Sequence, residues 1–159
     1  MIIAYIGVGA NLNNPKQQVI KSFKALEKLP HSSLISQSSL YLSPPMGPQD
    51  QDMYINAVAK LQTSLEAIEL LDHLQAIEKN HGRVRKSERW GARTLDLDLL
   101  LYGNKKINGA RLTVPHYGLK QRAFVLIPLL ELEPLLVLPD NSILSEQIEK
   151  IGSQGVKKL

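Results

Sequence analysis

Residues 94–102 are the segment that most restricts how this chain can fold. They read Thr-Leu-Asp-Leu-Asp-Leu-Leu-Leu-Tyr, with leucine at every second position from residue 95. Successive side chains of a β-strand point to opposite faces of the sheet, so the pattern predicts a strand with one buried face. Asp96 and Asp98 are then neighbours on the other face. The leucines expected on the buried face are Leu95, Leu97, Leu99 and Leu101.

The two aspartates are candidate catalytic residues and metal ligands. Carboxylates this close repel each other unless a cation lies between them. Mg²⁺ prefers oxygen ligands, commonly one or two carboxylates, and completes its coordination with water and substrate phosphates. Asp96 and Asp98 therefore indicate a magnesium site that acts on phosphates. The alternative interpretation is a half-buried strand that follows a solvated, charged loop.

Arginine is concentrated around this strand. All six arginines of the chain lie between residues 83 and 122, whereas the 13 lysines are spread from Lys16 to Lys158. The planar guanidinium group matches two phosphate oxygens at once, which an ammonium group cannot do. Segregated arginine therefore favours recognition of an anion over a generally basic surface. With the aspartate pair, it indicates a site for a polyphosphate and a metal.

Composition sets broader limits. With 159 residues, 43% of them hydrophobic, the chain is expected to form a single domain over residues 1–159. It contains no cysteine, which excludes disulfides, thiolate metal sites and a cysteine nucleophile. A net charge of +4 and a pI near 9.3 favour anionic ligands, either nucleic acid or ATP. The first residues do not resemble a signal peptide, and no apolar run approaches the ~20 residues of a membrane span, so we expect a soluble, cytoplasmic protein.

The periodicity of the remaining sequence predicts alternating strands and helices. Thr63 to Glu66 is interpreted as a capping box, and the tail after Pro139 is polar and indicates little. The expected order is strand 2–8, helix 15–29, strand 34–42, a proline-rich loop 43–53, strand 54–61, helix 64–80, the arginine-rich loop, the aspartate strand and helix 122–131. Two helices on one side of a mostly antiparallel sheet are typical of the ferredoxin-like split βαβ fold. We therefore predict an α+β class, with additional C-terminal helices.

Several segments together resemble the 6-hydroxymethyl-7,8-dihydropterin pyrophosphokinase family. They are Tyr-Ile-Gly-Val-Gly-Ala-Asn-Leu at 5–12, Ser-Pro-Pro-Met-Gly-Pro-Gln-Asp-Gln at 43–51, Tyr-Ile-Asn-Ala at 54–57, Arg-Trp-Gly-Ala-Arg-Thr-Leu-Asp-Leu-Asp at 89–98 and Val-Pro-His-Tyr at 114–117. The resemblance implies transfer of the β,γ-diphosphate of ATP to the hydroxymethyl group of the pterin, with release of AMP. It also implies that Asp96 and Asp98 hold two Mg²⁺ ions around the triphosphate of ATP, the co-substrate.

The resemblance also implies roles for other residues. Arg83 and Arg93 match arginines that contact the transferring phosphates, and Trp90 matches a residue that closes over the site. The positions that match nucleotide-binding residues are Gln75, Glu78, Arg85, Trp90, Leu99, Arg111, Thr113, His116, Tyr117 and Arg122. On the pterin side, Tyr54 and Phe124 resemble the aromatic pair that stacks on the ring, and the residues near its polar edge are Ser43, Pro44, Met46 and Asn56. No dedicated general base is evident.

Two other functions fit the composition. A basic ferredoxin-like domain could bind RNA, but no strand carries the aromatic signature that stacks bases, so no nucleic-acid partner is expected. A different Mg²⁺-dependent phosphotransferase or a nuclease could use the same aspartates. An ordinary P-loop kinase is excluded because the Gly-x-x-x-x-Gly-Lys-Ser/Thr loop is absent. The expected partners are therefore small-molecule substrates, without a membrane, and the expected assembly is a monomer.

Overall fold

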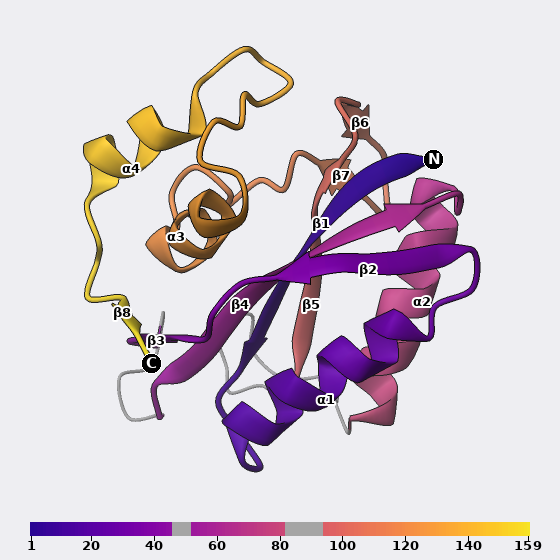
Figure 1. Cartoon of the computed structure of the whole chain (residues 1–159), viewed down its shortest axis with the longest axis horizontal. Helices are drawn as coiled ribbons and strands as arrows, with labels where there is room; N and C mark the ends of the chain where they lie inside the picture. The colour runs from indigo at the N-terminus through magenta and orange to yellow at the C-terminus, as the bar shows by residue number, and fades with distance from the viewer. Residues whose placement is uncertain (46–51, 82–93) are drawn as a thin grey trace.

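A central antiparallel sheet organises the fold (Figure 1). The computed structural model describes residues 1–45, 52–81 and 94–159. Within these residues the sheet has six strands in the order β5-β1-β4-β3-β8, with β2 also paired to β4. Every pairing in it is antiparallel. The strands are β1 Ile2–Ala10, β2 Ser32–Gln37, β3 Tyr41–Ser43, β4 Tyr54–Thr63, β5 Asp96–Tyr102 and β8 Lys157–Lys158. A separate hairpin pairs β6 Ile107–Asn108 with β7 Thr113–Val114.

The helices cover both faces of the sheet (Figure 1). On one face α1 Pro15–Glu27 and α2 Ala67–Asn80 bury residues such as Phe23 and Leu74 against the sheet. On the other face α3 Ala123–Leu132 and α4 Leu144–Ile151 bury a second cluster that includes Leu126 and Leu144. The predicted α+β, ferredoxin-like fold with additional C-terminal helices is therefore confirmed. Among the described residues, no helix is both long and apolar enough to cross a membrane.

The aspartate strand forms as predicted in its first part but not in its second. Leu97 and Leu99 belong to the core under α1 and α2, with Asp96 and Asp98 facing the other way. Leu101 was expected beside those leucines, and this was wrong because it packs under α3. The register shifts between Tyr5 and Ile6, so β5 contains one extra residue and its alternation changes face.

Two other local predictions were wrong in detail. Residues 34–42 are divided between two strands, β2 and β3, which both pair with β4. Between them the Ser38 hydroxyl accepts a hydrogen bond from the Val58 amide and so interrupts the backbone ladder with β4. The capping box of α2 uses Glu66 and Glu69, whereas Thr63 remains in β4. The polar C-terminal tail, for which local sequence indicated little, contains α4 and β8, in agreement with the additional C-terminal helices of the predicted fold.

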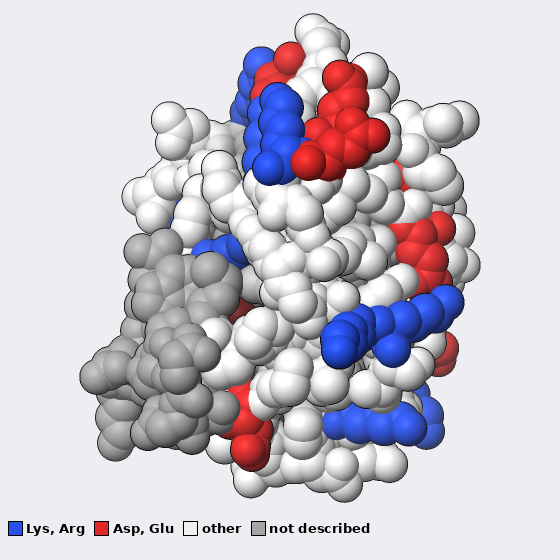
Figure 2. Space-filling model, turned by 90° about the vertical axis from the view of Figure 1, so that its left-hand side faces the viewer, with Lys and Arg blue, Asp and Glu red and all other residues white. Residues whose placement is uncertain are grey.

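The C-terminal elements contribute one side of the molecule. Figure 2 shows lysines and acidic residues interspersed with uncharged ones on this side. The net positive charge is therefore not gathered into one basic patch on the part of this side that the structure describes.

Candidate active site

The aspartate pair lies on the sheet face that α3 covers in part. In the register of β1 and β5, Gly9 is opposite Asp96 and Gly7 is opposite Asp98. Both glycines lack a side chain, so nothing from β1 projects between the aspartates and strand β4 on the far side of β1. The Asp98 side chain is 36% exposed. Two carboxylates of β5 thus border a stretch of sheet to which β1 contributes no side chain, although the Leu100 side chain lies over Gly7.

The other border of this stretch is formed by β4 and the end of β3. Asn56 is opposite Gly9 on β4, so a row runs across three strands from Asp96 through Gly9 to Asn56. The Ser43 hydroxyl donates a hydrogen bond to the side-chain oxygen of Asn56, and both residues are buried. Tyr54 lies on the same face, two residues before Asn56. An oriented amide and an aromatic ring are the groups that recognise a flat, polar heterocycle.

Gly9 is needed for this arrangement. A Cβ atom on it would lie 3.0 Å from the Asn56 side-chain nitrogen, closer than most real contacts. It would also lie 3.9 Å from the Tyr54 ring. The site role of Gly9 was not predicted, although its place in the resembling segment 5–12 was a signal for it.

His116 faces Asp98 from the segment that follows β7. Its Nε2 atom is 3.8 Å from the Asp98 Oδ2 atom, while its Nδ1 atom accepts the Gly118 amide at 3.0 Å. The His116 amide donates to the Leu100 carbonyl at 3.0 Å, which fixes the ring beside β5. Burial, and then the positive charge of Arg122, lower the pKa of His116 to about 4, although Asp96 acts in the opposite direction. The neutral ring therefore carries its proton on Nε2 and presents a hydrogen-bond donor to the site.

Arg122 joins two of the predicted aromatic residues. Its guanidinium carbon lies 5.4 Å from the centre of the Tyr117 ring and 5.8 Å from that of Phe124. The guanidinium rests against Gly118, where a Cβ atom would lie 2.5 Å from the Arg122 Nε atom. Tyr117 also stacks on His116, with ring centroids 4.5 Å apart. These four side chains form one continuous group at the start of α3.

A second group of predicted residues lies at the outer edge of β5. Glu78 of α2 is buried, and its Oε2 atom accepts the Leu97 amide at 2.8 Å. Arg111 donates to the Asp72 carboxylate at 2.6 Å and to the Gln75 side chain at 3.2 Å. Leu99 is buried against the helices on the face opposite the aspartates. Its side chain therefore points away from the face that carries Asp96 and Asp98.

The remaining predicted residues are divided between exposed and undescribed positions. Thr113 and Pro44 are exposed, at β7 and just after β3. Five predicted site residues lie outside the described ranges 1–45, 52–81 and 94–159, and they are Met46, Arg83, Arg85, Trp90 and Arg93.

The donor set is compatible with magnesium but not with a closed metal site. Within the described residues, no group of three or more His, Cys, Asp or Glu side chains could hold a metal ion. Asp96 and Asp98 offer two carboxylates on one face of β5, and the Asp98 side chain is partly exposed. This suits a cation that takes most of its ligands from water and substrate phosphates.

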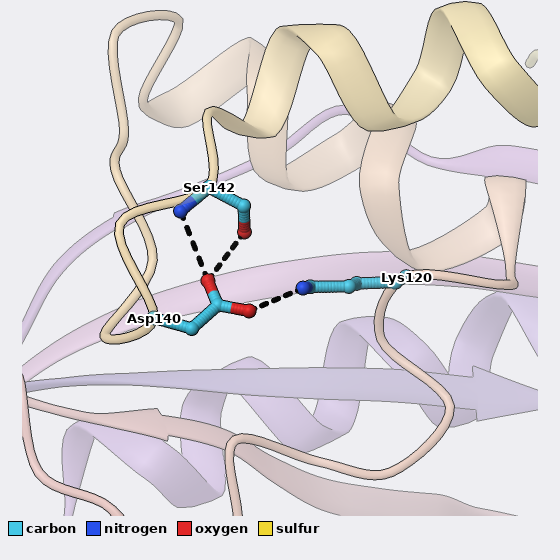
Figure 3. A network of polar contacts seen from close by, with 3 residues as sticks. All are labelled: Lys120, Asp140 and Ser142. Carbon is cyan, nitrogen blue, oxygen red and sulfur yellow. Dashed lines mark hydrogen bonds and ion pairs between the residues drawn. The ribbon is translucent and has the colours of Figure 1, made fainter.

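A surface hollow of about 220 Å³ adjoins the aromatic group. Its lining includes His116, Tyr117, Lys120 and Asp140. Asp140 accepts a hydrogen bond from Lys120 and another from the Ser142 amide at 3.0 Å (Figure 3). The bond from Lys120 and the two from the Ser142 hydroxyl and amide hold the pKa of the Asp140 carboxyl well below its usual range. The network fixes the loop before α4 against the segment before α3.

Together these features describe a ferredoxin-like α+β domain with two adjacent carboxylates on the sheet face that α3 partly covers. A model of the 7,8-dihydro-6-hydroxymethylpterin-pyrophosphokinase (HPPK) family matches residues 5–134. The 2-amino-4-hydroxy-6-hydroxymethyldihydropteridine pyrophosphokinase of Haemophilus influenzae is 50% identical over 159 residues, which is 100% of this chain and 99% of that protein. The protein of the same name from Pseudomonas aeruginosa is 47% identical over 155 residues, covering 98% of this chain and 95% of its own. The chain belongs to the HPPK family.

Solved structures agree on the fold. The crystal structure of an HPPK-DHPS in complex with substrates superposes with a TM-score of 0.75 at 12% identity. The wild-type Plasmodium falciparum HPPK-DHPS with SDX-DHP gives a TM-score of 0.72, also at 12% identity. The two matches cover 100% and 99% of this chain. This chain spans about half the length of each of those two proteins, 48% and 47%. Neither the RNA-binding alternative nor a different phosphotransferase finds support in these comparisons.

Proposed function

We infer that this protein is a pyrophosphokinase of folate biosynthesis. It transfers the diphosphate of ATP to the hydroxymethyl group of 6-hydroxymethyl-7,8-dihydropterin and releases AMP. Membership of the HPPK family and the full-length relatives of the same activity support this function. The structural observation that carries it is the row from Asp96 through Gly9 to Asn56. This row places carboxylates that can bind the magnesium of a triphosphate beside an amide that can form hydrogen bonds with a heterocycle.

The reaction makes and breaks one bond to the same phosphorus atom. The pterin hydroxyl oxygen attacks the β-phosphorus of ATP, and the bond from that phosphorus to the oxygen shared with the α-phosphate breaks. AMP leaves with the electron pair, and the hydroxyl proton is lost. Phosphoryl transfer of this kind depends on positioning and charge stabilisation. We assign His116 as a donor to a phosphate oxygen, because its Nε2 proton faces the same space as Asp98.

Asp96 and Asp98 are proposed to hold Mg²⁺, and the family resemblance suggests two ions. When bound, such ions neutralise the triphosphate and align it for attack. The position of both carboxylates on one face of β5 and the partial exposure of the Asp98 side chain support this assignment. Arg83 and Arg93 are proposed to contact the transferring phosphates.

The substrates are proposed to occupy the two ends of the row. The pterin would stack on Tyr54 and Phe124, and the proposed residues around its polar edge are Ser43, Pro44, Met46 and Asn56. The nucleotide would lie towards the edge of β5 and the start of α3. Its proposed contacts are Gln75, Glu78, Arg85, Trp90, Leu99, Arg111, Thr113, His116, Tyr117 and Arg122, with Trp90 also closing over the pterin. Because the Leu99 side chain is buried on the other face, its proposed contact is through the backbone. We further propose a single-domain monomer that works in the cytoplasm, where ATP is made.

The test is the nucleotide formed from MgATP and 6-hydroxymethyl-7,8-dihydropterin. AMP in step with pterin consumption is expected from the wild type and from Glu149→Ala, a control on the exposed side of α4. Asp96→Ala is expected to lose this product. ADP formation, or no pterin-dependent product from folded protein, would refute the proposed function.

A further inference from the structure

The C-terminal segment 152–159 connects two parts of the candidate site that are far apart in the chain. It leaves α4 and ends as β8 beside β3 (Figure 1). On the way it contacts the N-terminal end of α3, whose first turn carries Phe124. Strand β3 ends at Ser43, immediately before Pro44. Both sides of the proposed pterin site are therefore touched by one short segment.

Gln154 caps the first turn of α3 from a distance of 31 residues. Its side-chain oxygen accepts the Ala123 amide at 3.0 Å, and its side-chain nitrogen donates to the Gln121 carbonyl at 3.1 Å. The first amides of a helix have no partner inside the helix. Arg122, at the N-cap position, makes no side-chain cap bond. Gln154 therefore supplies the cap that the local sequence of α3 lacks.

The residues after Gln154 fix the same segment to β3. A Cβ atom on Gly155 would lie 3.5 Å from the Pro44 ring, so the two backbones run close together there. Lys157 and Lys158 pair with β3 opposite Leu42 and Tyr41. The Leu159 amide donates to the Leu40 carbonyl at 2.9 Å. The segment thus continues the sheet along the outer edge of a strand of only three residues.

We propose that Gln154 is a positioning residue for the pterin substrate. It holds the first turn of α3, and with it Phe124, in a set position relative to Ser43 and Pro44. The proposal rests on the pterin site described under the proposed function. The nucleotide side depends less on Gln154, because the Arg122 guanidinium is also held by Gly118 and by the Tyr117 ring.

The experiment compares Gln154→Ala with Gln17→Ala in the full-length protein. Both glutamines are exposed, but Gln17 lies on α1, on the opposite face of the sheet from α3. Steady-state AMP formation gives the KM for each substrate, and thermal unfolding reports stability. For Gln154→Ala we expect the pterin KM to rise about five-fold, the effect of losing a typical helix cap, and the ATP KM to change less than about two-fold. Gln154→Glu keeps the acceptor for Ala123 but not the donor to Gln121, so its pterin KM is expected to be intermediate.

Each outcome decides the proposal. A selective rise in the pterin KM, graded from glutamate to alanine and absent in Gln17→Ala, supports it. An unchanged pterin KM overturns it, and so does an equal rise in both KM values with a lower melting temperature, which would mean a merely structural role. If the wild type forms no AMP from pterin and ATP, the proposed function has failed, and the inference fails with it.

Discussion

The buried carboxylate of Glu78 accepts a hydrogen bond from the Leu97 backbone amide, which lies between the two aspartates of β5. Within residues 1–45, 52–81 and 94–159, β5 is the edge strand of the sheet, and no strand of this part of the chain pairs with its outer side. Glu78 therefore anchors the aspartate strand to α2. This bond therefore also fixes the position of Asp96 and Asp98, which lie on the opposite face of the sheet from α2.

Glu78→Ala is expected to destabilise the fold and lower activity. Leaving a buried amide without its acceptor costs about 1–3 kcal/mol. Urea denaturation of the variant and the wild type measures this loss. Glu78→Gln retains an acceptor oxygen and is expected to lose less. Equal stability of Glu78→Ala and the wild type would show that the bond does not anchor β5.

Asp98→Ala is expected to separate activity from stability. Loss of a group that serves the transition-state charge lowers the rate of AMP formation by about 10²-fold or more. Thermal stability is expected to change little, because the Asp98 side chain is 36% exposed and replacements of exposed side chains usually alter stability only slightly. Removal of divalent cations with EDTA should abolish wild-type activity, and added Mg²⁺ should restore it. Full activity in EDTA would contradict the magnesium site.

Gly9→Ala is expected to impair pterin binding. The added methyl group would lie 3.0 Å from the Asn56 side-chain nitrogen and force that amide to shift. We expect the pterin KM to rise roughly three- to ten-fold, since small displacements of positioning groups are costly. Gly109→Ala is the matched control, because its Cβ atom would meet the Leu112 carbonyl at an ordinary 3.5 Å. Identical pterin KM values for the two variants would argue against a role for Asn56 in binding.

Glu133 is expected to make the free energy of unfolding depend on pH. The hydrogen bond from Lys60, and another from the Tyr5 hydroxyl, lower the pKa of the Glu133 carboxyl from its usual 4.5. A carboxyl with a lowered pKa in the folded state stabilises the fold above pH 4.5, and this contribution is lost as the pH falls through the folded-state pKa. Urea unfolding between about pH 5 and pH 3 should therefore show a steeper loss of stability in the wild type than in Glu133→Gln. Lys60→Met should also flatten the profile, and parallel profiles for all three proteins would contradict the prediction.

Much of the fold and the centre of the site could be predicted from local pattern. Alternation over Leu95, Asp96, Leu97 and Asp98 placed the two carboxylates together on one face, as the structure has them. The α+β class followed from the order of strands and helices. These features depend on the two-residue and 3.6-residue periods of neighbouring positions, which are visible in the chain. The quoted segments carried the resemblance to the HPPK family, which the comparisons confirm.

Other features were decided only when distant segments met. The bulge in β5 turned Leu101 to the face under α3, and pairing with two strands put Gly9 between Asn56 and Asp96. On sequence pattern, Glu78 would count as part of a solvated helix face, yet it is buried against Leu97. Gln154 reaches Ala123 from a tail that showed no clear pattern. Strand register, bulges and helix capping by distant residues depend on which chain segments lie side by side. The periodicity within one segment does not specify which segment it pairs with.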